Sequence, residues 1–304
     1  FEEPALDEGL NEFWDQRMLQ ARGQKIHPAP RWLRAVGVNP GFDVFDFERF
    51  AAPRKEPADA PGQNAYRRLQ GIGPAYVRTA VTLRDLEQRI GSAAMERGFK
   101  EYYRRWKFRH PGMADLREAL ADASGQRAAV EAVFAQQMVA VAKIDDRLDA
   151  LTSVEQLPLP GTAQRNGVWI EETAGALDKR IAVLREQWRK AHPDAKPGSG
   201  PFPFLTSVTV RRRGAPVPQT IVVKFADGAS ETVRWDANET WHTFTWLKPA
   251  QAVSAELDPA RAHHLGVGKL DDSRTLKPDG RAARRWSADI GALAQVLLSL
   301  VATL

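Results

Sequence analysis

The spacing of hydrophobic residues changes once along the chain, and this change constrains the fold more than any other feature. In 74–90 and 129–141 the apolar residues recur every three or four positions, which is the period of an amphipathic helix. Beyond the Pro/Gly-rich stretch 196–201 they alternate with polar residues, as in 205–211 and 220–225, which is the period of half-buried strands. A run of helices followed by a run of strands predicts an α+β fold.

The helical part is expected to cover 1–144 as an all-α subdomain. Residues 23–63 are rich in Pro, Gly and charge, and we expect them to form a long ordered loop, which inside a domain is usually functional or an insertion. Glycines such as Gly91 and Gly125 follow the periodic segments, as is common where helices end. The predicted helices are 7–22, 74–90, 95–108, 116–124 and 129–141.

Residues 145–200 are expected to be a linker, because their composition shifts and Pro and Gly recur. Within it the sequence predicts a loop at 152–165, a short strand at 168–170 and a helix at 174–191.

The alternating segments of 201–265 predict five strands of a small antiparallel β-sandwich. Residues 266–304 are expected to form a C-terminal helix region, with the helix at 286–304. Its apolar run is interrupted by Asp289 and Gln295 and is too short for a membrane span. We therefore expect it to pack against the rest of the protein.

Charge and cysteine content narrow the classes of function. The chain carries 43 Lys and Arg against 38 Asp and Glu, for a net charge of +5. Its basic runs are scattered among acids, so solvated faces are favoured over a nucleic-acid site. The chain has no cysteine, which excludes disulfides, thiolate zinc sites and a cysteine nucleophile. No signal peptide is visible and Phe1 is not a natural translation start, so we expect the chain to come from something longer.

An acidic pair, Asp7-Glu8, opens the first predicted helix. A carboxylate in the first turn is favoured by the helix dipole, and the same carboxylate can be held out as a metal ligand. Both interpretations of Glu8 stay open on these residues alone. The apolar face of the helix consists of Leu10, Phe13, Trp14 and Met18.

Three stretches carry a family resemblance. They are Leu6-Asp7-Glu8-Gly9-Leu10, residues 73–87 around Tyr76, and residues 102–116 with Trp106 and His110-Pro111. They resemble, in turn, the Asn/Asp-Glu-Gly-Phe/Leu segment, the Tyr-containing helix and the Tyr-x-x-Trp-x-Phe-x-His-Pro run of M1-family zinc aminopeptidases, the gluzincins.

The resemblance implies roles for two residues. Glu8 would be the third zinc ligand, and the Tyr76 hydroxyl would donate a hydrogen bond to the oxyanion of the tetrahedral intermediate. Arg78 and Thr79 depart from the Lys and Gly that the family usually has after this Tyr. Tyr66 is the competing candidate for the catalytic Tyr.

The resemblance also implies what the chain lacks. The His-Glu-x-x-His segment, with two zinc ligands and the general base, is expected before Phe1, in the missing N-terminal portion of the same protein. The chain would be the C-terminal part of a thermolysin-like catalytic domain followed by the sandwich and the C-terminal helix. It would be inactive alone, with zinc and a peptide substrate bound by the intact parent. The resemblance favours the periplasm or the outside of the cell, with the cytoplasm as the alternative.

Two other functions remain open. The chain could be a non-catalytic binding or scaffold module with the M1 architecture. It could also bind glycans through the sandwich aromatics, which are Trp235, Trp241, Phe244 and Trp246, although alternation favours core packing for most of them. His110 and the pair His263-His264 lack partners at metal-ligand spacing, so no complete metal site is predicted.

Overall fold

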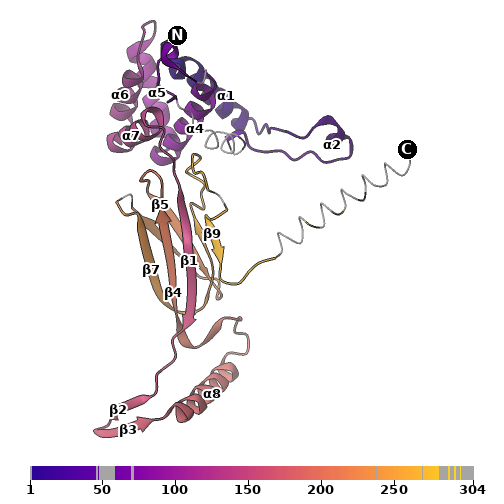
Figure 1. The fold of residues 1–304 in the computed structure, drawn as a ribbon, viewed down its shortest axis with the longest axis vertical. Coiled ribbons are helices and arrows are strands. Elements are labelled where there is room, and N and C mark those ends of the chain that lie inside the picture. Colours follow the sequence, from indigo (N-terminus) through magenta and orange to yellow (C-terminus); the bar gives the residue numbers. More distant parts are fainter. Residues whose placement is uncertain are drawn as a thin grey trace.

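The structure is a computed structural model, and it describes residues 2–45, 47, 59–69, 72–236, 238–268, 270–280, 287, 291 and 295. Three parts follow one another along the long axis in Figure 1: a helical unit, two β-sheets, and a small hairpin with a helix at the far end. The sheets are antiparallel throughout. The predicted mixture of helices followed by antiparallel strands is therefore confirmed.

The helices of the helical unit lie where the periodicity predicted them, with ends shifted by a few residues. Their apolar faces meet in one core that includes Phe13, Leu83, Leu86, Met95 and Leu120, all buried. The elements are the π-helix η1 (Ala5–Gly9), α1 (Leu10–Ala21), α2 (Arg31–Ala35), the 3-10 helix η2 (Ala65–Arg67), α4 (Gly73–Ile90), α5 (Ser92–Trp106), α6 (Met113–Ser124), α7 (Arg127–Val133) and the π-helix η3 (Phe134–Val139).

Two sheets pack face to face in the middle part. One has the strand order β1-β4-β7 and the other β6-β5-β8-β9, and apolar residues of both, such as Val208 and Val223, share one buried core. The predicted turn Asp227-Gly228 joins β5 to β6, with Gly228 at φ 96°. The strands are β1 (Asp146–Glu155), β4 (Ser199–Arg212), β5 (Gln219–Phe225), β6 (Ser230–Trp235), β7 (Trp241–Ala250), β8 (Ala252–Leu257) and β9 (Ser273–Thr275).

A buried arginine ties the two sheets together. Arg212 donates from Nε and Nη2 to the two carboxylate oxygens of Asp146, at 2.8 and 3.0 Å. Its guanidinium carbon lies 4.1 Å from the centroid of the Trp235 ring, which is fully buried. Phe244 and Trp246 are partly buried against the same core. Three of the four aromatics considered for a glycan platform thus pack inward, as alternation favoured, while Trp241 is 59% exposed.

The far end of the molecule is a β-hairpin and a helix. Strands β2 (Gly161–Arg165) and β3 (Val168–Glu172) are joined by Asn166-Gly167, both at positive φ, which is the usual sequence of a tight hairpin turn. Helix α8 (Ala174–Ala191) buries Leu177 and Ile181 against Phe202 at the start of β4. The predicted strand and helix in this region are confirmed.

Two predictions for 145–200 are corrected. The expected loop at 152–165 contains the end of β1, which pairs with β4 through Thr152 and Val154, and all of β2. The alternation of β1 was hidden because a bulge shifts its register between Leu148 and Ala150. Strand β1 therefore belongs to the sheets, not to a linker, and β4 begins at Ser199 within the expected linker.

The predicted C-terminal helix at 286–304 lies outside the described residues, apart from Ser287, Gly291 and Gln295. No helix within the described part of the chain has the length and hydropathy that a membrane span requires.

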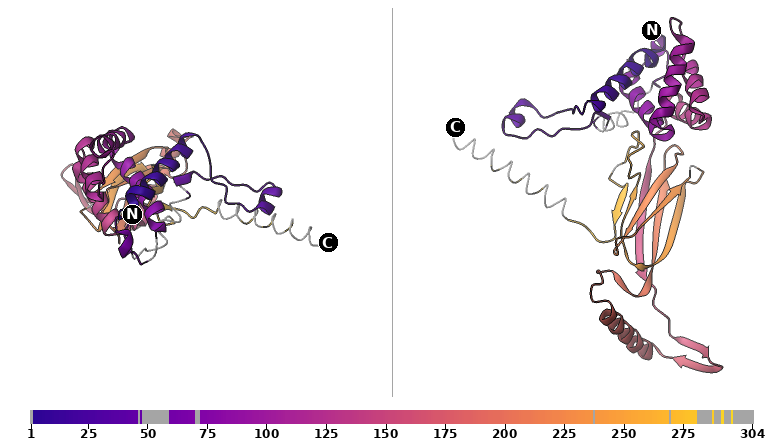
Figure 2. Two further views of the ribbon diagram at one scale, coloured as in Figure 1. Left: turned by 90° about the horizontal axis from the view of Figure 1, so that it is seen from above. Right: turned by 180° about the vertical axis from the view of Figure 1, so that it is seen from behind.

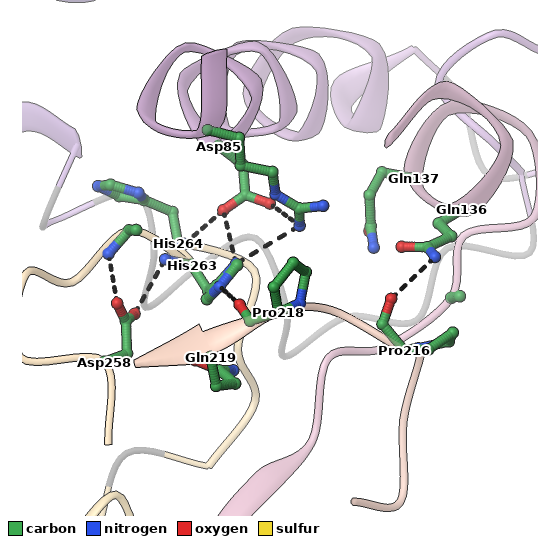
Figure 3. A network of polar contacts seen from close by, with 12 residues as sticks. Asp85, Gln136, Gln137, Pro216, Pro218, Gln219, Asp258, His263 and His264 are labelled. Carbon is green, nitrogen blue, oxygen red and sulfur yellow. Dashed lines mark hydrogen bonds and ion pairs between the residues drawn. The ribbon is translucent and has the colours of Figure 1, made fainter. Parts of the chain in front are cut away.

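A polar network joins α4 to the sheets (Figure 3). Asp85 is completely buried, and its carboxylate accepts hydrogen bonds from Arg89 Nη2 at 2.7 Å and from the backbone N–H of His264 at 3.1 Å. The His263 ring lies 3.7 Å from Asp85, and its Nε2 is 2.8 Å from the carbonyl oxygen of Pro218. Because a carbonyl oxygen only accepts, this nitrogen carries the proton. The network fixes α4 to the loop after β8 and to the segment before β5.

The same network predicts sensitivity to acid. Burial raises the pKa of the Asp85 carboxyl, but Arg89 and His263 outweigh burial and lower this pKa to about 2. Since the folded pKa is below the unfolded one, ionised Asp85 stabilises the fold above about pH 4, and this contribution is lost as the pH falls toward about 2. In urea titrations over this range, Asp85→Asn should lose less stability with falling pH than the unchanged chain. Equal slopes for both proteins would contradict the prediction.

Candidate active site

The structure brings Glu8 of η1 next to Tyr76 in the first turn of α4. Interaction of the Tyr76 hydroxyl with the Glu8 carboxylate is the main cause that raises the pKa of Tyr76. Burial acts in the same direction, as do the negative charges of Glu8, Asp7 and Glu12. The hydroxyl therefore keeps its proton well into the alkaline range and is available as a donor.

Gly9 allows this close approach. A Cβ at Gly9 would lie 2.5 Å from the carbonyl oxygen of Ala75 and 2.5 Å from the Cβ of Thr79. No side chain fits in that space, so the backbone of η1 packs directly against Ala75 and Thr79 of α4. The neighbouring Glu8 is thereby placed within reach of Tyr76.

The turn that carries Glu8 is wider than an ordinary helical turn. Residues Ala5–Gly9 form a π-helix, and the N–H of Leu10 donates to the carbonyl oxygen of Ala5, five residues back. Single π-turns inside helices occur often at functional sites, because the extra residue re-aims neighbouring side chains. Here the widened turn leaves Glu8 half-buried beside Tyr76.

We expect Gly9→Ala to destabilise the chain by about 1–3 kcal/mol, the usual cost of forcing extra atoms into a packed contact. The measurement is urea unfolding followed by far-UV circular dichroism. Gly73→Ala is the matched control, because a Cβ at Gly73 meets nothing within 4 Å. If Gly9→Ala were no less stable than Gly73→Ala, the close contact between η1 and α4 would be wrong.

An open cleft of about 760 Å³, within the range of small-molecule sites, lies between the N-terminal residues and the end of α5. Glu3 and Asp7 line it together with Tyr102, Trp106 and His110. Burial raises the pKa of Glu3, and burial raises the pKa of Tyr102 to about 12. Neither Glu8 nor Tyr76 lines this cleft, although Asp7 is the chain neighbour of Glu8.

The other residues considered from sequence lie elsewhere. Tyr66 is on η2 and is 79% exposed. Arg78 is buried, donates to Gln137 Oε1 at 3.0 Å, and has its pKa lowered by burial to about 10. His263 and His264 are buried in the polar network between α4 and the sheets.

Glu8 is a partial fit to a zinc site. A catalytic zinc needs three protein ligands and an open position for water, and Glu8 offers one carboxylate. Within the described ranges, no group of three or more His, Asp and Glu side chains lies close enough together to hold a metal ion. Further ligands would have to come from outside the described residues.

Sequence reasoning missed the buried charges. Asp85 and Arg89 are four residues apart on one helix, a spacing that favours an ion pair on any helix surface. Nothing in the sequence shows that this pair is buried, because its burial depends on the loop that carries His264. The sequence likewise places Arg212 among scattered surface cations. Its burial was missed because its carboxylate partner Asp146 lies on another strand.

Comparisons with solved structures show a distant likeness. No family model matches the chain, and no curated protein matches it either. Among solved structures, aminopeptidase A of Legionella pneumophila in complex with aspartic acid is similar, with a TM-score of 0.44 and 11% identity over 88% of this chain. The chain spans 24% of the length of that protein. A likeness this distant establishes neither a family nor an activity.

Proposed function

We propose that this chain is the C-terminal portion of a zinc-dependent, M1-type peptidase that hydrolyses peptide bonds. Glu8 is assigned as a metal ligand and Tyr76 as the hydrogen-bond donor. The observation that carries the proposal is that the two residues, which come from separate stretches of sequence, lie close enough for Glu8 to raise the pKa of Tyr76. The proposal places the protein in the periplasm or outside the cell, with the cytoplasm as the alternative.

Tyr76 has the properties that its assigned role needs. An oxyanion develops on a peptide carbonyl during hydrolysis, and a positioned donor in a partly desolvated site stabilises it strongly. The raised pKa of Tyr76 keeps the proton on the hydroxyl. In the substrate complex this hydroxyl would turn from Glu8 to the carbonyl oxygen.

Glu8 contributes only part of the chemistry. When bound, a zinc ion would polarise the carbonyl and lower the pKa of a water molecule. Glu8 would hold it through its carboxylate, while the remaining ligands and the general base belong to the missing N-terminal portion. The isolated chain should therefore bind zinc weakly and show no peptidase activity.

The test is metal analysis and hydrolysis of aminoacyl nitroanilides by the intact parent and by the isolated chain. We expect stoichiometric zinc and activity in the parent, and neither in the isolated chain. Glu8→Gln in the parent should lose both zinc and activity, whereas Asp15→Asn, an exposed carboxylate on α1, should retain them. Activity in the isolated chain would show that the site is wrongly assigned.

A non-catalytic binding or scaffold module is the second candidate. The close contact between η1 and α4 at Gly9 favours it, because that contact accounts for the placement of Glu8 and Tyr76 by packing alone. A parent that holds no zinc and hydrolyses no peptide, yet stays folded, would make this module the better account. Glu8 and Tyr76 would then be structural partners that fix η1 on α4.

A further inference from the structure

A narrow arm leaves the helical unit after α1 and carries α2 at its far end (Figures 1 and 2). The two sides of the arm are joined near its base, where the N–H groups of Ile26 and Phe42 each donate to the other residue's carbonyl oxygen at 2.9 Å. A Cβ at Gly41 would lie 2.7 Å from the His27 ring, so the two sides are in close contact there. The arm is a closed structure that extends from the body.

The charge of this arm has a single sign. Residues 22–42 contain four Lys and Arg and no Asp or Glu, against a net charge of +5 for the whole chain. All four cations are exposed, and within the described part of the chain none of them forms an ion pair. They are Arg22, Lys25, Arg31 and Arg34. Elsewhere, exposed cations such as Arg104, Arg127 and Arg189 lie among carboxylates and pair with them.

Apolar side chains are exposed on the same arm. Trp32 is 58% exposed, Val36 49% and Val38 43%. Helix α2 ends in a left-handed turn at Gly37, φ 82°, where the N–H of Val38 donates to the carbonyl oxygen of Leu33 at 2.9 Å. This closure is a Schellman motif, and it holds the exposed apolar residues together at the tip.

We propose that this arm docks the protein onto an anionic lipid surface. Cations beside a negatively charged leaflet are attracted to its headgroups, and Trp and aliphatic side chains among them enter the boundary between headgroups and acyl chains. The arm presents both kinds of side chain and none of the acids that would repel the surface. The proposal is independent of the proposed peptidase function.

A nucleic acid is the other anionic surface to consider. Binding of a single strand uses successive aromatic side chains on which bases stack. The exposed apolar residues at the tip are mainly aliphatic, with Trp32 as the lone ring among them. Aliphatic side chains gain little from contact with bases and gain much from burial in lipid, so the lipid surface is favoured.

The test is co-sedimentation of the full chain with phosphatidylcholine vesicles that contain or lack phosphatidylglycerol. We expect binding only where phosphatidylglycerol is present. Arg31→Gln with Arg34→Gln should weaken it roughly 30-fold, the effect of losing two cations near the surface. Trp32→Ala should weaken binding without any change in charge, which separates insertion from simple attraction.

The matched control is Arg189→Gln with Lys190→Gln on α8, where two exposed cations pair with Glu186. It removes the same charge and should leave vesicle binding unchanged. The proposal would be overturned if the arm and control variants lost vesicle binding equally. It would also be overturned if binding were the same with and without phosphatidylglycerol. Tighter binding of a single-stranded oligonucleotide that depends on the same arm residues would overturn it as well.

Discussion

Replacing Tyr76 with Phe in the intact parent should lower kcat by about two to three orders of magnitude, as for loss of one oxyanion donor. The substitution removes only the hydroxyl and keeps the ring that packs at the start of α4. KM should change little, because the hydrogen bond to substrate forms mainly in the transition state. The measurement is steady-state hydrolysis of an aminoacyl nitroanilide.

Tyr66→Phe is the control for this prediction. Tyr66 was the competing candidate, and its side chain is 79% exposed on η2, so its loss should leave kcat unchanged. Urea unfolding of both variants would show that neither has lost its fold. An unchanged kcat for Tyr76→Phe would remove Tyr76 from the site, and a large loss for Tyr66→Phe would move the assignment there.

Replacing Asp85 with Ala should destabilise the chain by about 3–5 kcal/mol, the usual result of removing one partner of a buried ion pair. Arg89 would keep its charge beside the buried space, and the backbone N–H of His264 would lose its acceptor. The N–H of a buried backbone group without a partner adds its own desolvation cost. Urea unfolding followed by circular dichroism measures the loss.

Asp122→Ala is the matched control for Asp85. Asp122 also pairs with arginines, at 2.9 and 2.5 Å, but its side chain is 38% exposed. Ion pairs in contact with water contribute little, so this change should cost at most about 1 kcal/mol. Similar losses for both variants would show that burial does not determine how much the Asp85–Arg89 ion pair contributes to the free energy of unfolding.

The sequence predicted the regular elements better than their contacts. The helical period located α4, α5 and α6, because each has an apolar stripe that faces one core. Strand β1 was missed because its bulge at Leu148 breaks the alternation, and β9 because three residues carry no period. Periodicity reports which face of an element is buried, not which other element covers it.

The candidate site was predicted from a resemblance, and its geometry was not. Glu8 and Tyr76 can each be identified from the sequence, but their proximity depends on the close contact at Gly9. An isolated Glu-Gly pair does not reveal that contact. Residues 23–42 of the arm lie within the predicted long loop and Arg22 ends the predicted helix 7–22, yet the exposed cations and apolar tip of the arm became visible only in three dimensions.

The most direct test of the central claim is to determine the coding sequence immediately upstream of the codon for Phe1. The proposal predicts a His-Glu-x-x-His segment on a helix there, which would complete a zinc site with Glu8. If that segment is missing, or if its histidines are replaced, the peptidase assignment fails. Glu8 and Tyr76 would then remain as structural residues of a non-catalytic module.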